Sequence, residues 1–181
     1  MGKIRNTARR MLTATVAVVL ATVGTLVVAQ GAQASDPPAP TSTSARHTPR
    51  GTGATALLLD IRHAKHATFD RLVIDLRGAK PGYDVRYVSA VTYDPSGRRV
   101  TMPGRYYLQV VLDPASAYNA NGNHTYGGQN RVTTGYPTLK GFVINGDFEA
   151  VLSVALGLSK KAGFRVSTLA NPTRIVIDVA H

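Results

Sequence analysis

Two pairs of side chains in this 181-residue sequence have a type and spacing that could support chemistry. His63 and His66 lie three residues apart, but a zinc site would also need a carboxylate or a third histidine nearby. Arg62 and Lys65, which neighbour them, would repel a metal ion. We therefore interpret both histidines as surface residues, and we expect neither a metal nor a cofactor.

The second pair is Asp147 and Glu149, two carboxylates of the kind that glycosidases use. They flank a tight turn, and turn chemistry alone explains acidic residues there. The sequence has no Gly-x-Ser-x-Gly nucleophile elbow and no glycine-rich phosphate loop. It also has no cysteine, which excludes a cysteine nucleophile, disulfides and zinc held by thiolates. We predict that the protein is not an enzyme.

The charge of the chain predicts an anionic partner. Basic residues outnumber acidic ones by 21 to 10 in the whole sequence and by 15 to 9 from Thr55 onward. An even spread of this excess would serve solubility alone. Several basic residues occur at turns, however, where long side chains can converge. We predict that these residues bind an anionic polymer: Arg98, Arg99, Arg105, Lys160 and Lys161.

Tyrosine is the main aromatic residue, with eight copies and no tryptophan in the sequence. Tyrosines on strands suit core packing better than ligand binding. Tyr118 and Tyr126 instead belong to a long polar stretch around residues 119–130, which is too polar to be core. We predict that these two are secondary binding residues.

The first 34 residues are typical of a secretory signal peptide. Four basic residues precede an uncharged run over residues 11–29, and small residues at Ala32 and Ala34 precede Ser35. We predict cleavage between Ala34 and Ser35, which makes the protein secreted or cell-wall associated. An uncleaved membrane anchor is the alternative, because this run approaches the ~20 residues that span a bilayer. Arg9-Arg10 also resembles a twin-arginine export signal.

Residues 35–54 are rich in proline, serine, threonine and glycine and offer almost nothing to bury. We predict a disordered linker there, followed by one domain over residues 55–181. In that domain apolar residues alternate and turn signals are frequent, which predicts an all-β fold: an antiparallel β-sandwich with two packed sheets. Residues 149–158 could instead form one short helix. The predicted strands are 56–63, 69–77, 83–93, 98–102, 105–113, 138–147, 149–158, 164–169 and 174–179.

One strand pattern, Arg-aliphatic-Val-Ile-Asp-aliphatic, occurs at residues 71–76 and again at residues 174–179. In a strand, one face of each copy is apolar core and the other is charged. If the copies lie side by side, an antiparallel pairing with Val73 opposite Val176 sets each arginine against the aspartate of the other copy. Parallel pairing would oppose like charges, so we predict the antiparallel register.

Together with residues 82–88, 146–152 and 164–166, the repeated strands resemble the AMIN and AMIN-like domains of exported bacterial proteins. The resemblance spans residues 57–179 and implies a β-sandwich with two related sheets. AMIN domains hold cell-wall amidases and secretins at peptidoglycan, and the AMIN-like variant is similar to a stand-alone exported domain of actinobacteria. Only Ala180 and His181 follow the matching region, so we expect a binding role without a hydrolase role.

We therefore expect an exported, non-catalytic module that binds peptidoglycan or an associated anionic cell-wall polymer. Export argues against a nucleic-acid partner, and we expect membrane contact only if the signal segment is uncleaved. The alternative is a protein-interaction domain, either an inhibitor or an assembly partner of an envelope protein. A wall hydrolase is a third hypothesis, which a zinc-dependent activity lost on chelation would reveal.

Overall fold

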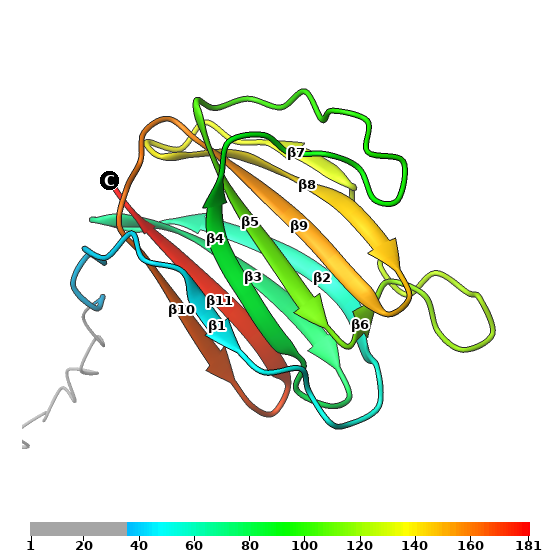
Figure 1. The fold of residues 1–181 in the computed structure, drawn as a ribbon. Helices are drawn as coiled ribbons and strands as arrows, with labels where there is room; N and C mark the ends of the chain where they lie inside the picture. The colour runs from blue at the N-terminus through cyan, green and yellow to red at the C-terminus, as the bar shows by residue number, and fades with distance from the viewer. Residues whose placement is uncertain (1–35) are drawn as a thin grey trace, which may run out of the picture. The chain divides into compact units, whose positions relative to one another are not determined.

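Alternating apolar side chains along the chain form two β-sheets that pack face to face (Figure 1). The computed structural model describes residues 36–181. The six-stranded sheet has the order β1 (Arg46–Thr48), β4 (Gly82–Val88), β5 (Tyr106–Asp113), β9 (Val151–Leu158), β8 (Leu139–Phe148) and β7 (Arg131–Thr133). The five-stranded sheet has the order β10 (Phe164–Leu169), β11 (Thr173–Ala180), β3 (Phe69–Arg77), β2 (Ala56–Lys65) and β6 (Ala115–Ser116). This arrangement confirms the predicted all-β sandwich.

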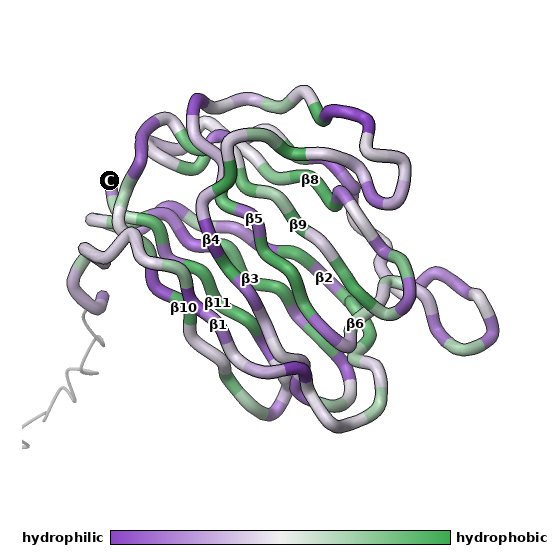
Figure 2. Tube along the Cα trace, viewed as in Figure 1, coloured by the Kyte–Doolittle hydropathy of each residue, from purple (hydrophilic) through white to green (hydrophobic). Residues whose placement is uncertain are grey.

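Neighbouring strands run antiparallel except for the pair β2 and β6, which is parallel. The inner faces of both sheets share one apolar core, and hydrophobic positions alternate with polar ones along β3 (Figure 2). In β3 the alternate residues Leu72, Ile74 and Leu76 are fully buried, as the period of a strand requires. Residues 36–181 contain no helix long and apolar enough to cross a membrane.

Residues 149–158 do not form the helix that was the alternative, because Val151–Leu158 is strand β9 at the centre of its sheet. Residues 152–158 are all buried, which removes the alternation that marks a half-exposed strand. The covering segment is residues 89–105, whose Val100 and Met102 pack with Ala155 on the outer side of this sheet. Gly157 permits this approach, because a Cβ there would overlap the carbonyl oxygen of Pro103.

The predicted strand over residues 98–102 is absent for the same reason. The segment makes one isolated bridge, between Thr92 and Arg99, and the amide of Val100 donates to the carbonyl oxygen of Val91 at 2.9 Å. It folds over a sheet and does not join one. The predicted strand over residues 83–93 correspondingly ends at Val88.

The prediction of a disordered linker over residues 35–54 is not supported by the structure. Residues 46–48 form β1, which pairs with β4 and closes one edge of the six-stranded sheet. Before it, Pro40 is buried, and the amide of Phe164 in β10 donates to the carbonyl oxygen of Ser42 at 2.8 Å. Backbone pairing and proline packing replace the apolar side chains that the segment lacks. The predicted signal peptide and its cleavage site, Ala34 and Ser35, lie outside the described residues.

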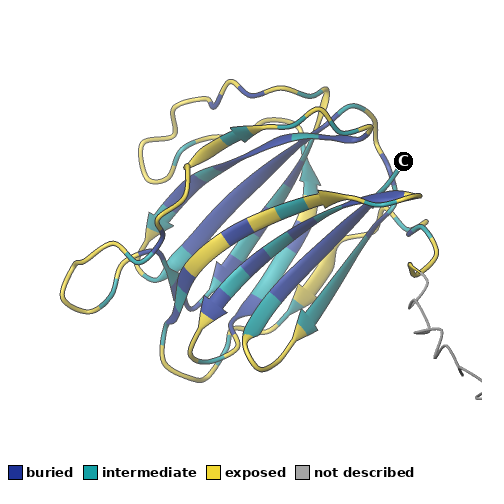
Figure 3. Ribbon diagram, turned by 180° about the vertical axis from the view of Figure 1, so that it is seen from behind, coloured by how far each residue is buried: buried dark blue, intermediate teal, exposed yellow. Residues whose placement is uncertain are grey.

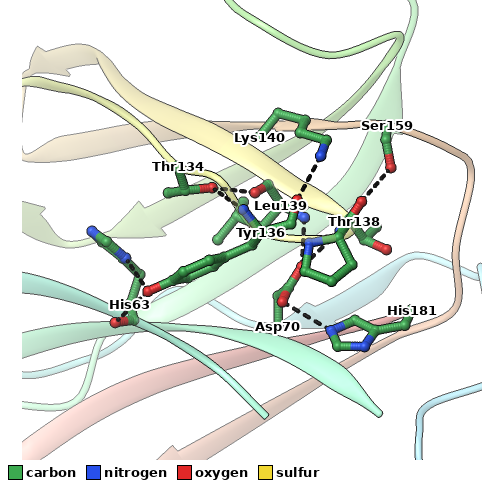
Figure 4. A network of polar contacts seen from close by, with 10 residues as sticks. His63, Asp70, Thr134, Tyr136, Thr138, Leu139, Lys140, Ser159 and His181 are labelled. Carbon is green, nitrogen blue, oxygen red and sulfur yellow. Dashed lines mark hydrogen bonds and ion pairs between the residues drawn. The ribbon is translucent and has the colours of Figure 1, made fainter. Parts of the chain in front are cut away.

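A buried carboxylate links the two sheets where both ends of the described chain meet. Asp70 of β3 accepts hydrogen bonds from the amides of Thr138 and Leu139, each at 2.8 Å, and from the ring of His181 at 2.9 Å (Figure 4). The amide of His181 donates to the carbonyl oxygen of Thr68 at 3.0 Å. The other end is anchored at the same turn by a hydrogen bond between the carboxylate of Asp36 and the ring of His66.

Candidate binding face

The repeated strands, β3 and β11, lie side by side in the centre of the five-stranded sheet. They pair antiparallel with Val73 opposite Val176, so the predicted register is confirmed. Arg71 and Asp178 are opposite each other and form an ion pair with an Nε–Oδ1 distance of 2.6 Å. This pairing places the charged halves of both strands on the outer surface of the sandwich.

Asp75 is opposite Arg174, as predicted, but it binds a different arginine. Its carboxylate accepts two hydrogen bonds from Arg62 of β2, at 2.6 Å and 2.9 Å. Among residues 36–181, Arg174 forms no ion pair with a carboxylate. Its Nε donates to the carbonyl oxygen of Pro172 at 3.3 Å, which leaves the two terminal nitrogens of its guanidinium group for a ligand.

Arg165 of β10 adds a second arginine to Asp178, with an Nη2–Oδ2 distance of 2.6 Å. Burial would raise the pKa of Asp178, but the hydrogen bonds from Arg71 and Arg165 outweigh burial and lower it. The hydrogen bond to Asp178 also raises the pKa of Arg71. Arg71 and Asp178 therefore remain charged at neutral pH, and two arginines around one carboxylate leave a net positive charge.

We call this surface the arginine face, and define it by Arg62, Arg71, Arg165 and Arg174 with Asp75 and Asp178. In the view from behind, the face shows exposed and half-buried positions between buried ones (Figure 3). A groove of about 290 Å³ crosses it, with Val73 and Val176 among its lining residues. Three of the arginines line the same groove, together with His66 and Leu169. The arrangement can bind an anionic group against a partly apolar surface.

The basic residues predicted from the sequence lie elsewhere and do not form one cluster. Arg105 and the pair Lys160 and Lys161 share one end of β9, since the amide of Arg105 donates to the carbonyl oxygen of Leu158 at 2.7 Å. Lys161 lies 5.6 Å from the ring centre of Tyr87. All three basic residues are exposed.

Arg98 and Arg99 lie further along the same sheet. The carbonyl oxygen of Arg98 accepts a hydrogen bond from the amide of Tyr93. The amide of Asp94, the residue after Tyr93, donates to the carbonyl oxygen of Asn145 in β8. Gly146, which follows Asn145, is opposite Ser153, about five residues or roughly 16 Å before Leu158 at the end of β9. The convergence that we predicted for all five basic residues is therefore not observed.

The two predicted loop tyrosines differ from each other. Tyr118 is exposed and packs edge-on against His124, with ring centres 4.8 Å apart. Tyr126 is only 3% exposed and belongs to the core, so its prediction as a binding residue is wrong. The loop folds back on itself through a bridge between Tyr118 and His124, and the hydroxyl of Tyr126 donates to the carbonyl oxygen of Gln129 at 2.9 Å.

The pairs that could have supported chemistry are separated or already engaged. His63 turns inward to the hydroxyl of Tyr136 at 3.0 Å, whereas His66 turns outward to Asp36. Asp147 accepts a hydrogen bond from the amide of Ala117 at 2.7 Å, and Glu149 lies in the adjoining turn. Within residues 36–181 no three histidine or acidic side chains are placed to hold a metal ion.

The sequence analysis did not select any of the four arginines of the arginine face as a candidate binding residue, although a signal was present. The repeated pattern already gave both strands one charged face, and the predicted pairing joined these faces. What the pattern did not indicate was that β2 and β10 flank the pair and bring Arg62 and Arg165 to it. The predicted binding residues lie at turns, whereas the four arginines of the arginine face lie on the outer side of a sheet.

Two packed sheets, one of which carries the repeated motif on two neighbouring strands with an arginine-lined outer surface, define a class of small β-sandwich domain. A family model for the AMIN-like domain matches residues 56–181. The chain therefore belongs to the AMIN-like domain family. No curated protein and no solved structure is significantly similar to the chain.

Proposed function

We propose that this chain is an exported, non-catalytic module that binds peptidoglycan or an associated anionic wall polymer of the cell envelope. Membership in the AMIN-like family supports a cell-wall-related role, and the signal-peptide pattern supports export. The observation that carries the proposal is the arginine face, where three guanidinium groups line a groove and Arg165 lies beside them, while only two carboxylates, Asp75 and Asp178, pair with the four arginines.

The groove suits an extended chain that bears carboxylate or phosphate groups. Arg174 presents a planar guanidinium group that can donate paired hydrogen bonds to such groups, and Arg62, whose Nε and Nη2 donate to Asp75, keeps its Nη1 as a further donor. Val73 and Val176 offer an apolar surface to the uncharged part of the polymer. Exposed charges are screened over about 8 to 10 Å at physiological salt, so binding should weaken as salt is raised.

The test is retention on purified cell walls, measured before and after their anionic polymers are removed. Arg62→Gln with Arg174→Gln should reduce retention about tenfold, if each lost contact is worth about 0.7 kcal/mol. The matched control, Arg98→Gln with Arg99→Gln, removes the same charge from the other sheet and should bind as the wild type does. Stripping the anionic polymers should abolish the difference between the two variants.

Equal losses in both double variants would show that only net charge matters, and would remove the arginine face from the proposal. Unchanged retention in both variants and in high salt would point to a neutral glycan or a protein as the ligand.

A protein partner has one observation in its favour. β10 is the edge of the five-stranded sheet, and its last residue, Leu169, is 44% exposed. Such an edge can accept a strand from another protein. Crosslinking in intact cells would distinguish this function, because it would capture an envelope protein at β10 in place of wall polymer.

A further inference from the structure

The N-terminal strap, residues 36–42, lies against one end of the arginine face. The carboxylate of Asp36 is 2.8 Å from Nδ1 of His66, and the carbonyl oxygen of Pro38 accepts a hydrogen bond from Arg165 at 3.0 Å. The amide of Phe164 donates to the carbonyl oxygen of Ser42 at 2.8 Å. The strap thus places its one acidic side chain among cationic groups.

The surface beneath the strap is built around Phe69, whose ring is fully buried although position 69 belongs to the outer face of β3. His66 stacks on this ring with centres 4.5 Å apart and planes inclined by 14°. The guanidinium groups of Arg71 and Arg165 lie 5.1 Å and 5.8 Å from the ring centre. Three nitrogen-rich side chains therefore surround one aromatic ring, which favours cations at its face.

This cluster is continuous with the groove of the arginine face, because His66 and Arg71 line both. Arg71 and Arg165 share the single carboxylate of Asp178, so the cluster keeps one uncompensated positive charge. Asp36 approaches it from outside, with its side chain 41% exposed. A carboxylate from the chain itself thus occupies a position that suits an external anion.

Gly163 is the residue that permits the strap to occupy this position. A Cβ placed there would overlap the carbonyl oxygen of Pro40 and the backbone of Thr41. Gly163 has no left-handed backbone angle that would otherwise require glycine. Its role in the structure is therefore to make room for the strap.

We propose that His66, Arg71 and Arg165 form an anion subsite for a carboxylate or phosphate group, and that Asp36 occupies it as a displaceable internal ligand. The subsite extends the groove, so a wall polymer that enters the groove displaces the strap at this end. The proposal rests on the proposed function only in assigning that polymer as the ligand. An internal ligand that occupies the subsite nine-tenths of the time lowers the apparent affinity about tenfold.

The test uses inorganic phosphate, titrated into the isotope-labelled protein while the ring signals of His66 and the guanidinium signal of Arg71 are followed by NMR. Gly163→Ala should release the strap and raise the affinity for phosphate about tenfold. The matched control is Gly127→Ala, since a Cβ at Gly127 meets open space. The control should bind phosphate as weakly as the wild type.

Asp36→Asn provides a second route that leaves the packing of Gly163 intact. It removes the competing charge and retains the contacts of Pro38 and Ser42, so the affinity for phosphate should rise several-fold. Wild-type affinity in both Gly163→Ala and Asp36→Asn, or no saturable response of His66 and Arg71 in any of the proteins, would overturn the proposal.

Two polymer probes then distinguish the source of the anion and separate this proposal from the previous one. Poly(glycerol phosphate) carries phosphate groups and polygalacturonate carries carboxylates, and the tighter binder of Gly163→Ala identifies the preferred group. The Arg62→Gln and Arg174→Gln protein should lose polymer affinity and keep its response to inorganic phosphate. Loss of the phosphate response as well would mean that no separate subsite exists, whereas failure of wall binding alone would count only against the proposed function.

Discussion

Asp178 is a buried carboxylate held between two arginines. Its side chain is 3% exposed, and a charge at such a position is costly unless it is paired. Burial by itself would raise its pKa, but the hydrogen bonds from Arg71 and Arg165 outweigh burial, and the pKa lies below its ordinary value. The folded domain therefore stabilises the ionised form of Asp178 more than the unfolded chain does.

This shift predicts how stability depends on pH. Because the pKa of Asp178 is lower in the folded state, its contribution is fully present above about pH 4, the unfolded value, and is lost as the pH falls through the folded value. Asp178→Asn should lower the free energy of unfolding by about 3 kcal/mol at pH 7. The difference from wild type should shrink as the pH is lowered towards 3.

Urea denaturation at pH 7, 5 and 3 measures this difference. Asp60→Asn is the control, because Asp60 is exposed and its carboxylate accepts only the amide of the next residue. A difference that stays constant over this pH range would show that Asp178 is not ionised preferentially in the folded state.

At the scale of single residues, the sequence predicted positions better than partners. The arginine and the aspartate of the repeated pattern were enough to predict the register of the two strands, with Val73 opposite Val176. They could not show that Asp75 binds Arg62, because β2 carries a bulge between Leu58 and Asp60 that the pattern does not contain. Tyr126 was mispredicted because a polar loop can still insert one ring into the core.

The turn between β8 and β9 is the element under the clearest backbone strain. Its two residues, Glu149 and Ala150, have φ angles of 50° and 59°, in the left-handed region that residues with a side chain rarely adopt. Asparagine and glycine are preferred at such positions in two-residue hairpin loops. The sequence does not use the residues that this turn favours.

Ala150→Gly should therefore raise the free energy of unfolding by about 1 kcal/mol, because glycine removes the energetic cost of one left-handed residue. The control is the same substitution in a strand, Ala64→Gly in β2, which should destabilise by roughly 0.5 to 1 kcal/mol. Urea denaturation measures both proteins. If Ala150→Gly loses as much stability as the control does, the backbone at Ala150 is not strained.

Prediction of the elements followed the alternation of apolar residues, and it failed where alternation was the wrong guide. Residues 98–102 alternate, yet Val100 and Met102 point at the outer side of a sheet and form no strand. β1, β6 and β7 have only two or three residues each, too few for a period to be visible.

At the scale of the whole molecule, the domain is larger than its family match. The family model begins at residue 56, but β1 covers β4, which would otherwise be an open edge of the six-stranded sheet. The strap similarly covers the beginning of β10. Composition could not reveal this, because the segment contributes backbone hydrogen bonds and buried proline in place of apolar side chains.

A protein that begins at Thr55 should therefore be less stable than one that begins at Asp36. We expect a loss of about 3 kcal/mol, the order of magnitude for one short strand pairing and one buried side chain. This corresponds to a melting temperature lower by roughly 6 to 12 °C. The exposed edge of β4 should also promote self-association.

Calorimetry and size-exclusion chromatography measure these two effects. Equal melting temperatures and a monomeric shorter protein would show that residues 36–54 are dispensable for the fold.

Both ends of the described chain are fastened to the turn between β2 and β3, Asp36 through His66 and His181 through Thr68 and Asp70. Figure 1 shows the C-terminus close to the blue segment that starts at residue 36. A β-sandwich whose two ends lie close together can be inserted into a surface loop of another protein through two short linkers, without distortion of either fold. Recombination can therefore carry this unit as an insert within another polypeptide as easily as at its end.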